Sequence, residues 1–169
     1  MFDRALCRAV IHQLALLKKL KTKDMLVKKG LLPSQVNLCS FWAQQQNDID
    51  HLLLNCQIAW SIWCNIAAGF EVQLTRQQRF RHFYEAWMSK SFHNTIRKKL
   101  FILAFFAVAW SLWTKRNKIV FEQQELDIQA LQLIIRWRIA LWSKAWKDYI
   151  PYFGEQLAGN FSSIPMLFP

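Results

Sequence analysis

The sequence predicts a mainly α-helical protein whose helices form a bundle of about five. Only four Gly and four Pro occur in 169 residues, so few positions interrupt a helix strongly. Hydrophobic residues make up 53% of the chain and include nine Trp, a composition that supports a packed core and excludes a disordered tail. The longer apolar segments repeat at spacings of three and four residues, the period of a helix that buries one face. The length corresponds to about one domain.

The N-terminal part predicts two helices and a loop. Residues 3 to 21 form an amphipathic helical pattern. Thr22 can cap a second, short helix that ends at Lys29, and Gly30 can adopt the left-handed conformation that stops it. Residues 31 to 38 contain a proline and predict a loop.

Four longer helices follow, at residues 57–68, 75–89, 95–122 and 127–150. Gly69 ends the first of them, and Asp127 starts the last. The nearly apolar run from Leu100 to Trp113 is 14 residues long, whereas a membrane span needs about 20. We therefore expect a buried central helix and no membrane partner. After the last helix, residues 151–169 predict an irregular tail.

The helix at 75–89 mixes arginines with aromatic side chains. Such a mixture can stack on unpaired bases, but a helix with one buried aromatic face and one solvated basic face has the same pattern. We prefer the second interpretation. The basic residues concerned are Arg76, Arg79 and Arg81.

Three residues in the middle of the N-terminal half have the spacing of metal ligands. Cys39 is followed by His51 and then by Cys56, three quarters of a four-ligand zinc site in which an irregular zinc-knuckle-like turn precedes the helices. Trp42 occupies the position where such a site has its second thiolate. On a regular α-helix, residues five apart point about 140° away from each other. His51 and Cys56 can therefore meet at one ion only if the helix ends or distorts near Asn55.

The net charge of +11 is unevenly distributed. Residues 1–30 carry eight Lys and Arg against two acids, residues 71–122 carry ten against three, and residues 31–70 carry two acids and no base. Basic segments on both sides of a neutral module suit a nucleic-acid partner with a phosphate backbone. Solvated helix faces give the same excess and remain the alternative.

Catalytic patterns are missing from the sequence, and we expect no enzyme. The four glycines never cluster into a phosphate-binding loop, and no serine stands in a Gly-x-Ser-x-Gly turn. Asp48 and Asp50 are the only closely spaced acids before residue 120, too few for a two-metal centre. The charged N-terminus is unlike a signal peptide, so the four cysteines predict a reduced, intracellular setting.

Two segments of the chain resemble one known family. Leu20 to Gly30, then Cys39, then Asp50-His51-Leu52-Leu53-Leu54-Asn55-Cys56 and Ile62-Trp63, are similar to the reverse transcriptase zinc-binding domain of plant non-LTR (LINE-type) retrotransposons. Downstream, the segment from Trp110 to Phe121 resembles the Trp-x-x-Trp-x-x-Arg-Asn signature of the C-terminal region of these elements. The two matches lie in the family's order and together span roughly residues 11 to 121.

The resemblance implies that the chain is a truncated or decayed copy of the C-terminal part of such an element. It implies a degenerate zinc-binding domain at residues 11–68, a helical C-terminal region at 75–150 packed with it, and a non-catalytic accessory role in binding RNA or DNA. It implies zinc ligands at Cys39, His51 and Cys56, and phosphate contacts by basic residues. Because Trp42 replaces the second thiolate and an indole nitrogen has no lone pair to offer, we expect weakened Zn²⁺ binding. The expected location is the nucleus. The predicted phosphate contacts are Lys18, Lys19, Lys21, Lys28, Lys29, Arg97, Lys98 and Lys99.

Two alternatives to this function remain open. A zinc-free helical module could bind a protein partner through its Trp-rich faces, with Trp42 packed on Trp60 or Trp63 in place of the metal. A decayed element could also have no molecular function. Cys64, eight residues beyond Cys56, is a further candidate for the missing ligand.

Overall fold

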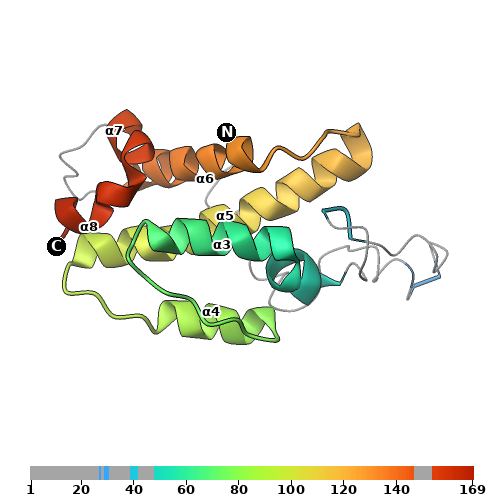
Figure 1. Ribbon diagram of the computed structural model, residues 1–169, viewed down its shortest axis with the longest axis horizontal. Helices are drawn as coiled ribbons and strands as arrows, with labels where there is room; N and C mark the ends of the chain where they lie inside the picture. The colour runs from blue at the N-terminus through green and yellow to red at the C-terminus, as the bar shows by residue number, and fades with distance from the viewer. Residues whose placement is uncertain (1–26, 28, 31–38, 42–47, 147–153) are drawn as a thin grey trace.

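The computed structural model describes residues 27, 29–30, 39–41, 48–146 and 154–169, and this part of the chain contains helices and no strand. It confirms the mainly α-helical fold class. Figure 1 shows the arrangement. The elements are η2 (His51–Asn55), α3 (Gln57–Ala68), α4 (Phe80–Met88), α5 (Thr95–Glu122), α6 (Ile128–Ser143), α7 (Gly154–Gly159), η3 (Phe161–Ser163) and α8 (Ile164–Leu167).

Helix α5 is the centre of the bundle, as its apolar sequence predicts. It contacts α3, α4, α6 and η2, and α6 also packs on α3 and α7. In Figure 1, α4 and α6 lie on opposite sides of the layer formed by α3 and α5. Apolar residues line α5 on several sides, including Leu100, Phe105 and Leu112, because neighbouring helices cover it all round. None of the described helices is long and apolar enough to cross a membrane.

The core is built from aromatic rings around Phe105 of α5. Its ring centroid lies 5.0 Å from that of Trp63 in α3 and 5.7 Å from that of Trp87 in α4. Trp87 also stacks on Phe101, with 4.2 Å between centroids, and its indole N–H donates to the Phe101 carbonyl. Such ring pairs add about 0.5–1.5 kcal/mol each beyond the area they bury. Side chains from three helices therefore fix how α3, α4 and α5 pack together.

Side-chain caps set the starts of the two longest helices. The Asn94 side chain accepts hydrogen bonds from the main-chain N–H groups of Ile96 and Arg97, so α5 begins at Thr95. Asp127 accepts from Ala130 N–H in the same way and confirms the predicted start of α6. Helix α6 ends at Ser143, before the predicted Ile150, which lies outside the described residues.

Helix α4 begins later than predicted. Residues 75–79 are irregular, and the helix starts at Phe80, the first buried residue of the segment. The Asp50 carboxylate accepts the Phe80 N–H at 2.9 Å and so fixes this start from outside the helix. From there the preferred interpretation is confirmed, since Phe80, Phe83 and Trp87 are buried and Arg79 and Arg81 are exposed.

The prediction of an irregular tail was wrong. Residues 154–167 form α7, η3 and α8, and the side chains of Leu157, Phe161 and Ile164 are buried, whereas Met166 is exposed. Its Phe161 ring packs on Phe70 at 5.4 Å and lies directly over Gly69. A Cβ at Gly69 would come within 2.4 Å of that ring. Gly69 has a φ of −63°, so the reason for glycine is this close approach and not a left-handed turn.

Part of the N-terminal prediction can be compared with the structure. Gly30 has a φ of +69° and donates its N–H to the Val27 carbonyl at 2.8 Å, which confirms the left-handed stop. The helices predicted at 3–21 and from Thr22, the loop at 31–38 and the position of Trp42 lie outside the described residues.

Candidate metal centre

The three predicted ligands meet in the structure. One ligand atom each from Cys39, His51 and Cys56 lie within 4.8 Å of one another. All three side chains are buried, with 3%, 7% and 0% of their surface exposed. The Cys39 thiol donates a hydrogen bond to Cys56 Sγ at 4.0 Å. Residues 12 and 17 positions apart in the chain thus form one compact group of sulfur and imidazole donors.

A π-helical turn brings His51 and Cys56 together. Residues His51–Asn55 form η2, and the Cys56 N–H bonds to the His51 carbonyl, five residues earlier, at 2.7 Å. This wider turn supplies the distortion near Asn55 that the spacing requires, since residues five apart come back to one side of the helix. In Figure 1, η2 leads directly into α3 at the end remote from α7 and α8.

Hydrogen bonds from outside the turn hold it in place. The Asp48 carboxylate accepts the His51 N–H at 2.6 Å, and the Asp48 carbonyl accepts the Leu52 N–H at 2.9 Å. At the other side, the buried Trp63 indole N–H donates to the Leu53 carbonyl at 2.7 Å. Leu52, Leu53 and Leu54 are fully buried. The main chain that carries the ligands is therefore fixed by the core.

The environment of Cys56 favours a thiolate. The hydrogen bond from Cys39 lowers the pKa of Cys56 from 9.0 to about 4, and burial opposes this shift. Hydrogen bonds from the His51 side chain and from the main chain at Ala59 and Ile58 act with Cys39. The main-chain groups belong to the first turn of α3, where a helix favours negative charge. Zinc binds the thiolate form of cysteine, so Cys56 is prepared as a ligand.

His51 has a ring nitrogen without a hydrogen-bond partner among the described residues. This atom, Nε2, is buried. Buried polar atoms nearly always have a partner, so this nitrogen is available to a ligand. A metal ion is a partner that both sulfurs would share. Two thiols and an imidazole match the ligand types that zinc prefers.

The fourth ligand is not among the side chains that the structure brings together. Trp42 lies outside the described residues, so its predicted packing on Trp60 or Trp63 stays a prediction. Cys64 is half-buried on α3 and does not belong to the ligand group. Burial raises the pKa of the Cys64 thiol, which makes it a poorer ligand than Cys56.

Arg116 on α5 is a charged neighbour of the site that the ligand spacing did not reveal. Its side chain is 2% exposed, its guanidinium lies 5.3 Å from the Trp113 ring, and its Nη1 donates to the Asn117 side chain at 2.9 Å. Burial lowers the pKa of Arg116, and the charge of Cys39 opposes this shift. The Trp-x-x-Trp-x-x-Arg-Asn segment therefore places a buried cation within electrostatic reach of the cysteine pair.

The predicted phosphate contacts differ from one another in their surroundings. Arg97 donates to the Phe70 carbonyl at 2.7 Å and pairs with Glu71 at 3.4 Å, and Lys98 donates to the main-chain carbonyls of Met88 and Lys90. Lys29 and Lys99 are exposed. Lys18, Lys19, Lys21 and Lys28 lie outside the described residues. Arg97 and Lys98 thus use their donors to attach the start of α5 to its neighbours.

Comparisons with known proteins place this chain in no family. No family model matches it, and no curated protein and no solved structure matches it significantly. A function for this chain therefore has to be argued from the geometry described above.

Proposed function

We propose that Cys39, His51 and Cys56 bind a zinc ion and that the chain is a non-catalytic accessory domain which this ion stabilises at one end. The observation that carries the proposal is the convergence of three buried ligand atoms within 4.8 Å around a π-helical turn. π-Helical turns are rare and occur frequently at functional sites. The orphaned His51 Nε2 and the prepared Cys56 thiolate support the same conclusion.

Each ligand has a distinct part in such a site. His51 and Cys56 are held on the two ends of η2, which the core fixes. Cys39 comes from a segment outside the helices, and its sulfur reaches Cys56 across 17 residues of chain. A bound zinc ion supplies a cross-link between these segments. Removal of either cysteine should therefore release the segment at Cys39 and leave η2 folded.

Three protein ligands leave one coordination position for a water molecule. A complete structural site contributes about 10–16 kcal/mol of apparent binding free energy at neutral pH, and a three-ligand site should contribute less. Trp42 cannot fill the position through its indole nitrogen. We therefore expect zinc to bind with one ion per chain but more weakly than in a four-ligand site.

Native mass spectrometry of the full chain, titrated with zinc, tests this proposal. We expect one zinc ion per chain, loss of binding in Cys56→Ser, and unchanged binding in Cys64→Ser, the matched control from the same helix. Trp42→Cys should tighten binding at least tenfold, because it offers a second thiolate. Absence of zinc from both the wild type and Trp42→Cys would contradict the proposal.

A second proposed function, nucleic-acid binding, is favoured by the exposed arginines before and on α4. Arg76, Arg79 and Arg81 are exposed, and Arg76 lies over the Trp60 ring at 4.9 Å. The exposed guanidinium groups suit the phosphates of a single strand. The resemblance to the retrotransposon domain points to the same partner class. We therefore propose this surface, and not Arg97 and Lys98, as the phosphate-binding surface.

Salt dependence tests the second function. Binding of a 20-nucleotide single-stranded RNA is measured from 50 to 200 mM salt. The slope of log K against log salt is negative, and each lost phosphate contact reduces its magnitude by about 0.7. The double variant Arg79→Gln/Arg81→Gln should thus reduce the magnitude by about 1.4, and Arg97→Gln should leave the slope unchanged. Affinity that does not fall with salt excludes the phosphate contacts.

A further inference from the structure

Arg116 places a buried positive charge near the candidate metal centre. Its side chain is 2% exposed, and none of the described carboxylates pairs with it. The acids closest to η2 in the chain, Asp48 and Asp50, accept the main-chain N–H groups of His51 and Phe80. The Arg116 Nε atom is buried and has no hydrogen-bond partner in the described part of the chain. An unpaired buried cation is costly, so Arg116 requires a negative charge nearby.

Without a metal ion, the cysteine pair supplies that charge. The hydrogen bond from Cys39 stabilises Cys56 as a thiolate, so the pair carries one negative charge. Burial lowers the pKa of Arg116, and the charge of Cys39 opposes this shift, which places the guanidinium within electrostatic reach of the pair. One thiolate and one guanidinium therefore balance each other in this buried region.

A bound zinc ion changes this balance. Cysteine binds zinc as a thiolate and histidine as a neutral imidazole, so the three protein ligands contribute two negative charges, which cancel those of the ion. The metal site is then neutral, and Arg116 loses its partner. A water molecule in the fourth position leaves this sum unchanged. A monovalent anion in that position gives the site one negative charge and restores the partner of Arg116.

We propose that a small monovalent anion takes the fourth coordination position of this zinc ion and that the guanidinium of Arg116 retains it there. This inference rests on the zinc site proposed above and names its missing ligand. A third thiolate at position 42 would supply the same charge, but the chain has Trp42 there. Ser40, next to Cys39, has a buried hydroxyl oxygen without a described partner and offers a further donor. The protein ligands are at most 7% exposed, so the anion has to be small, such as a halide or azide.

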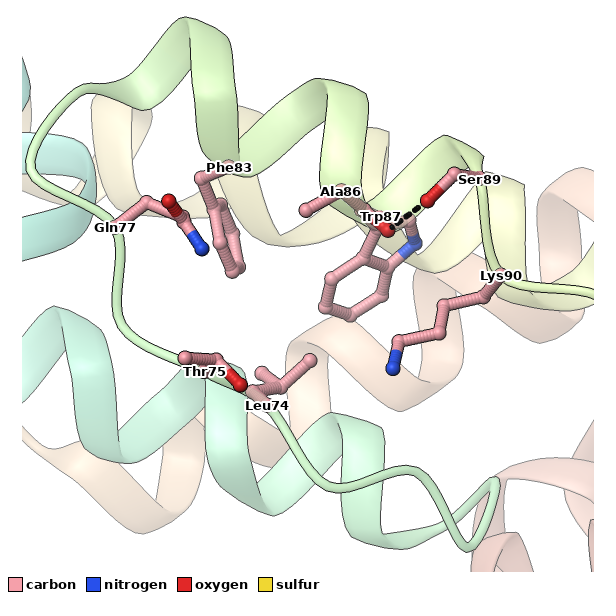
Figure 2. Close-up of a pocket in the computed structure, with 8 residues that line it drawn as sticks. All are labelled: Leu74, Thr75, Gln77, Phe83, Ala86, Trp87, Ser89 and Lys90. Atoms are coloured by element: carbon pink, nitrogen blue, oxygen red, sulfur yellow. Dashed lines mark hydrogen bonds between the residues drawn. The ribbon is translucent and has the colours of Figure 1, made fainter.

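A cation beside a cavity elsewhere in the molecule provides a contrast. Figure 2 shows the side chain of Lys90 extending along the pocket that Leu74 and Trp87 line. Lys90 is exposed, so water solvates its charge, and an exposed ion pair gains little. The charge of Arg116 is buried, where the attraction of an anion is stronger. Lys90 is therefore the control for a cation that should not retain the anion.

The test uses the full chain loaded with Co²⁺, whose visible absorption bands report the ligands of a zinc site. Azide is titrated at constant ionic strength, with perchlorate, which coordinates metals poorly, as the balancing anion. We expect one azide to bind per cobalt ion and to change the spectrum. Trp42→Cys offers a thiolate for the same position and should bind azide about tenfold more weakly, because the anion then has to displace a protein ligand.

Substitution of Arg116 separates its charge from its packing. Arg116→Met removes the charge and should weaken azide binding by about tenfold, a difference of about 1.4 kcal/mol, whereas Arg116→Lys and Lys90→Gln should stay within about threefold of the wild type. In buffer without azide, Arg116→Met should bind Co²⁺ at least as tightly as the wild type, because the removed charge repels the ion. A role of Arg116 in packing alone predicts the opposite, a weaker metal site with unchanged affinity for azide.

The possible results separate the anion site from the zinc site itself. A folded wild type that binds neither Co²⁺ nor Zn²⁺ overturns both. A cobalt spectrum that azide leaves unchanged overturns the anion site alone, and so does equal azide affinity in the wild type and in Arg116→Met. Arg116→Gln takes the place of Arg116→Met if the methionine variant melts at a lower temperature than the wild type.

Discussion

The aromatic core around Phe105 and the ligand group at Cys39 are both buried, but they are held together by different interactions. In the core, rings from α3, α4 and α5 contact one another, and no charge is involved. In the ligand group, two sulfurs and an imidazole face each other beside a buried guanidinium, and His51 Nε2 lacks a described partner.

With the zinc binding proposed above, this difference indicates which part of the fold the ion would stabilise. Packing of apolar rings is complete without any ligand, because each ring already has its neighbours. Buried donors and charges are costly until they are paired. The core should therefore fold the bundle without metal, whereas the metal should determine the stability of the end that contains Cys39.

The largest effect is expected from a substitution in the aromatic core. Phe105→Ala removes the ring that links α3, α4 and α5 and should lower the free energy of unfolding by about 3–5 kcal/mol. Urea denaturation followed by circular dichroism measures this loss. Phe121→Ala, on the same helix but at a side chain that is 75% exposed, should change stability by less than about 0.5 kcal/mol. Similar losses in both variants would contradict the central position of Phe105.

Zinc should stabilise the end of the molecule that contains the ligand group. At a zinc concentration of one hundred times Kd, binding should stabilise the chain by about 2.7 kcal/mol. Hydrogen exchange should then slow at η2 and the first turn of α3, and not at the centre of α5. The measurement needs a constant pH near 7.5: the pKa of Cys56 is lowered from 9.0 to about 4, so the stability that its thiolate contributes decreases as the pH falls from 9 toward 4. Uniform slowing across the chain would show that zinc does not act locally.

A smaller effect is expected where the C-terminal segment joins the core. Gly69→Ala places a Cβ against the Phe161 ring and should cost about 2 kcal/mol, because the ring must move. The melting temperature reports this cost. Gly159→Ala, where a Cβ has nothing within 4 Å, is the matched control and should not destabilise the chain. If both variants melt like the wild type, the contact between α3 and the C-terminal helices is unimportant for stability.

The smallest effect on stability is expected at Arg97 and distinguishes a structural role of this residue from a role in phosphate binding. Arg97→Gln removes the hydrogen bond to the Phe70 carbonyl and should lower stability by about 1 kcal/mol. Lys118→Gln, an exposed change on the same helix, should leave stability within about 0.5 kcal/mol of the wild type. Unchanged stability in Arg97→Gln would return this residue to the candidates for phosphate contact.

The sequence predicted those parts of the fold that local patterns determine. The bounds of α3 and α5 and the Asp127 cap follow from helical periodicity and capping side chains, which act within a few residues. The start of α4 depends on Asp50, thirty residues earlier in the chain. The C-terminal segment is helical because Leu157 and Phe161 are buried against the rest of the bundle. Contacts between residues so far apart in the sequence leave no pattern in the local sequence.

The candidate site was predictable to a similar extent. Cysteine and histidine spacing indicated the ligands and even the need for a distorted turn. The same spacing gave no sign of Arg116, sixty residues beyond Cys56, because only the packing of α5 on η2 brings it near. Nor did the basic residues at 97–99 show that two of them bond to main-chain carbonyls.

The π-helical turn ties the spacing of the ligands to one kind of helical turn. Four residues of an α-helix and five residues of a π-helix both complete about one turn, so His51 and Cys56 meet at a spacing of five only while η2 keeps its wider turn. Deletion of one residue between them would leave a spacing of four, at which an α-helical turn again places both side chains on one side. The ligand pair should therefore tolerate this deletion better than an insertion of one residue, which neither kind of turn accommodates.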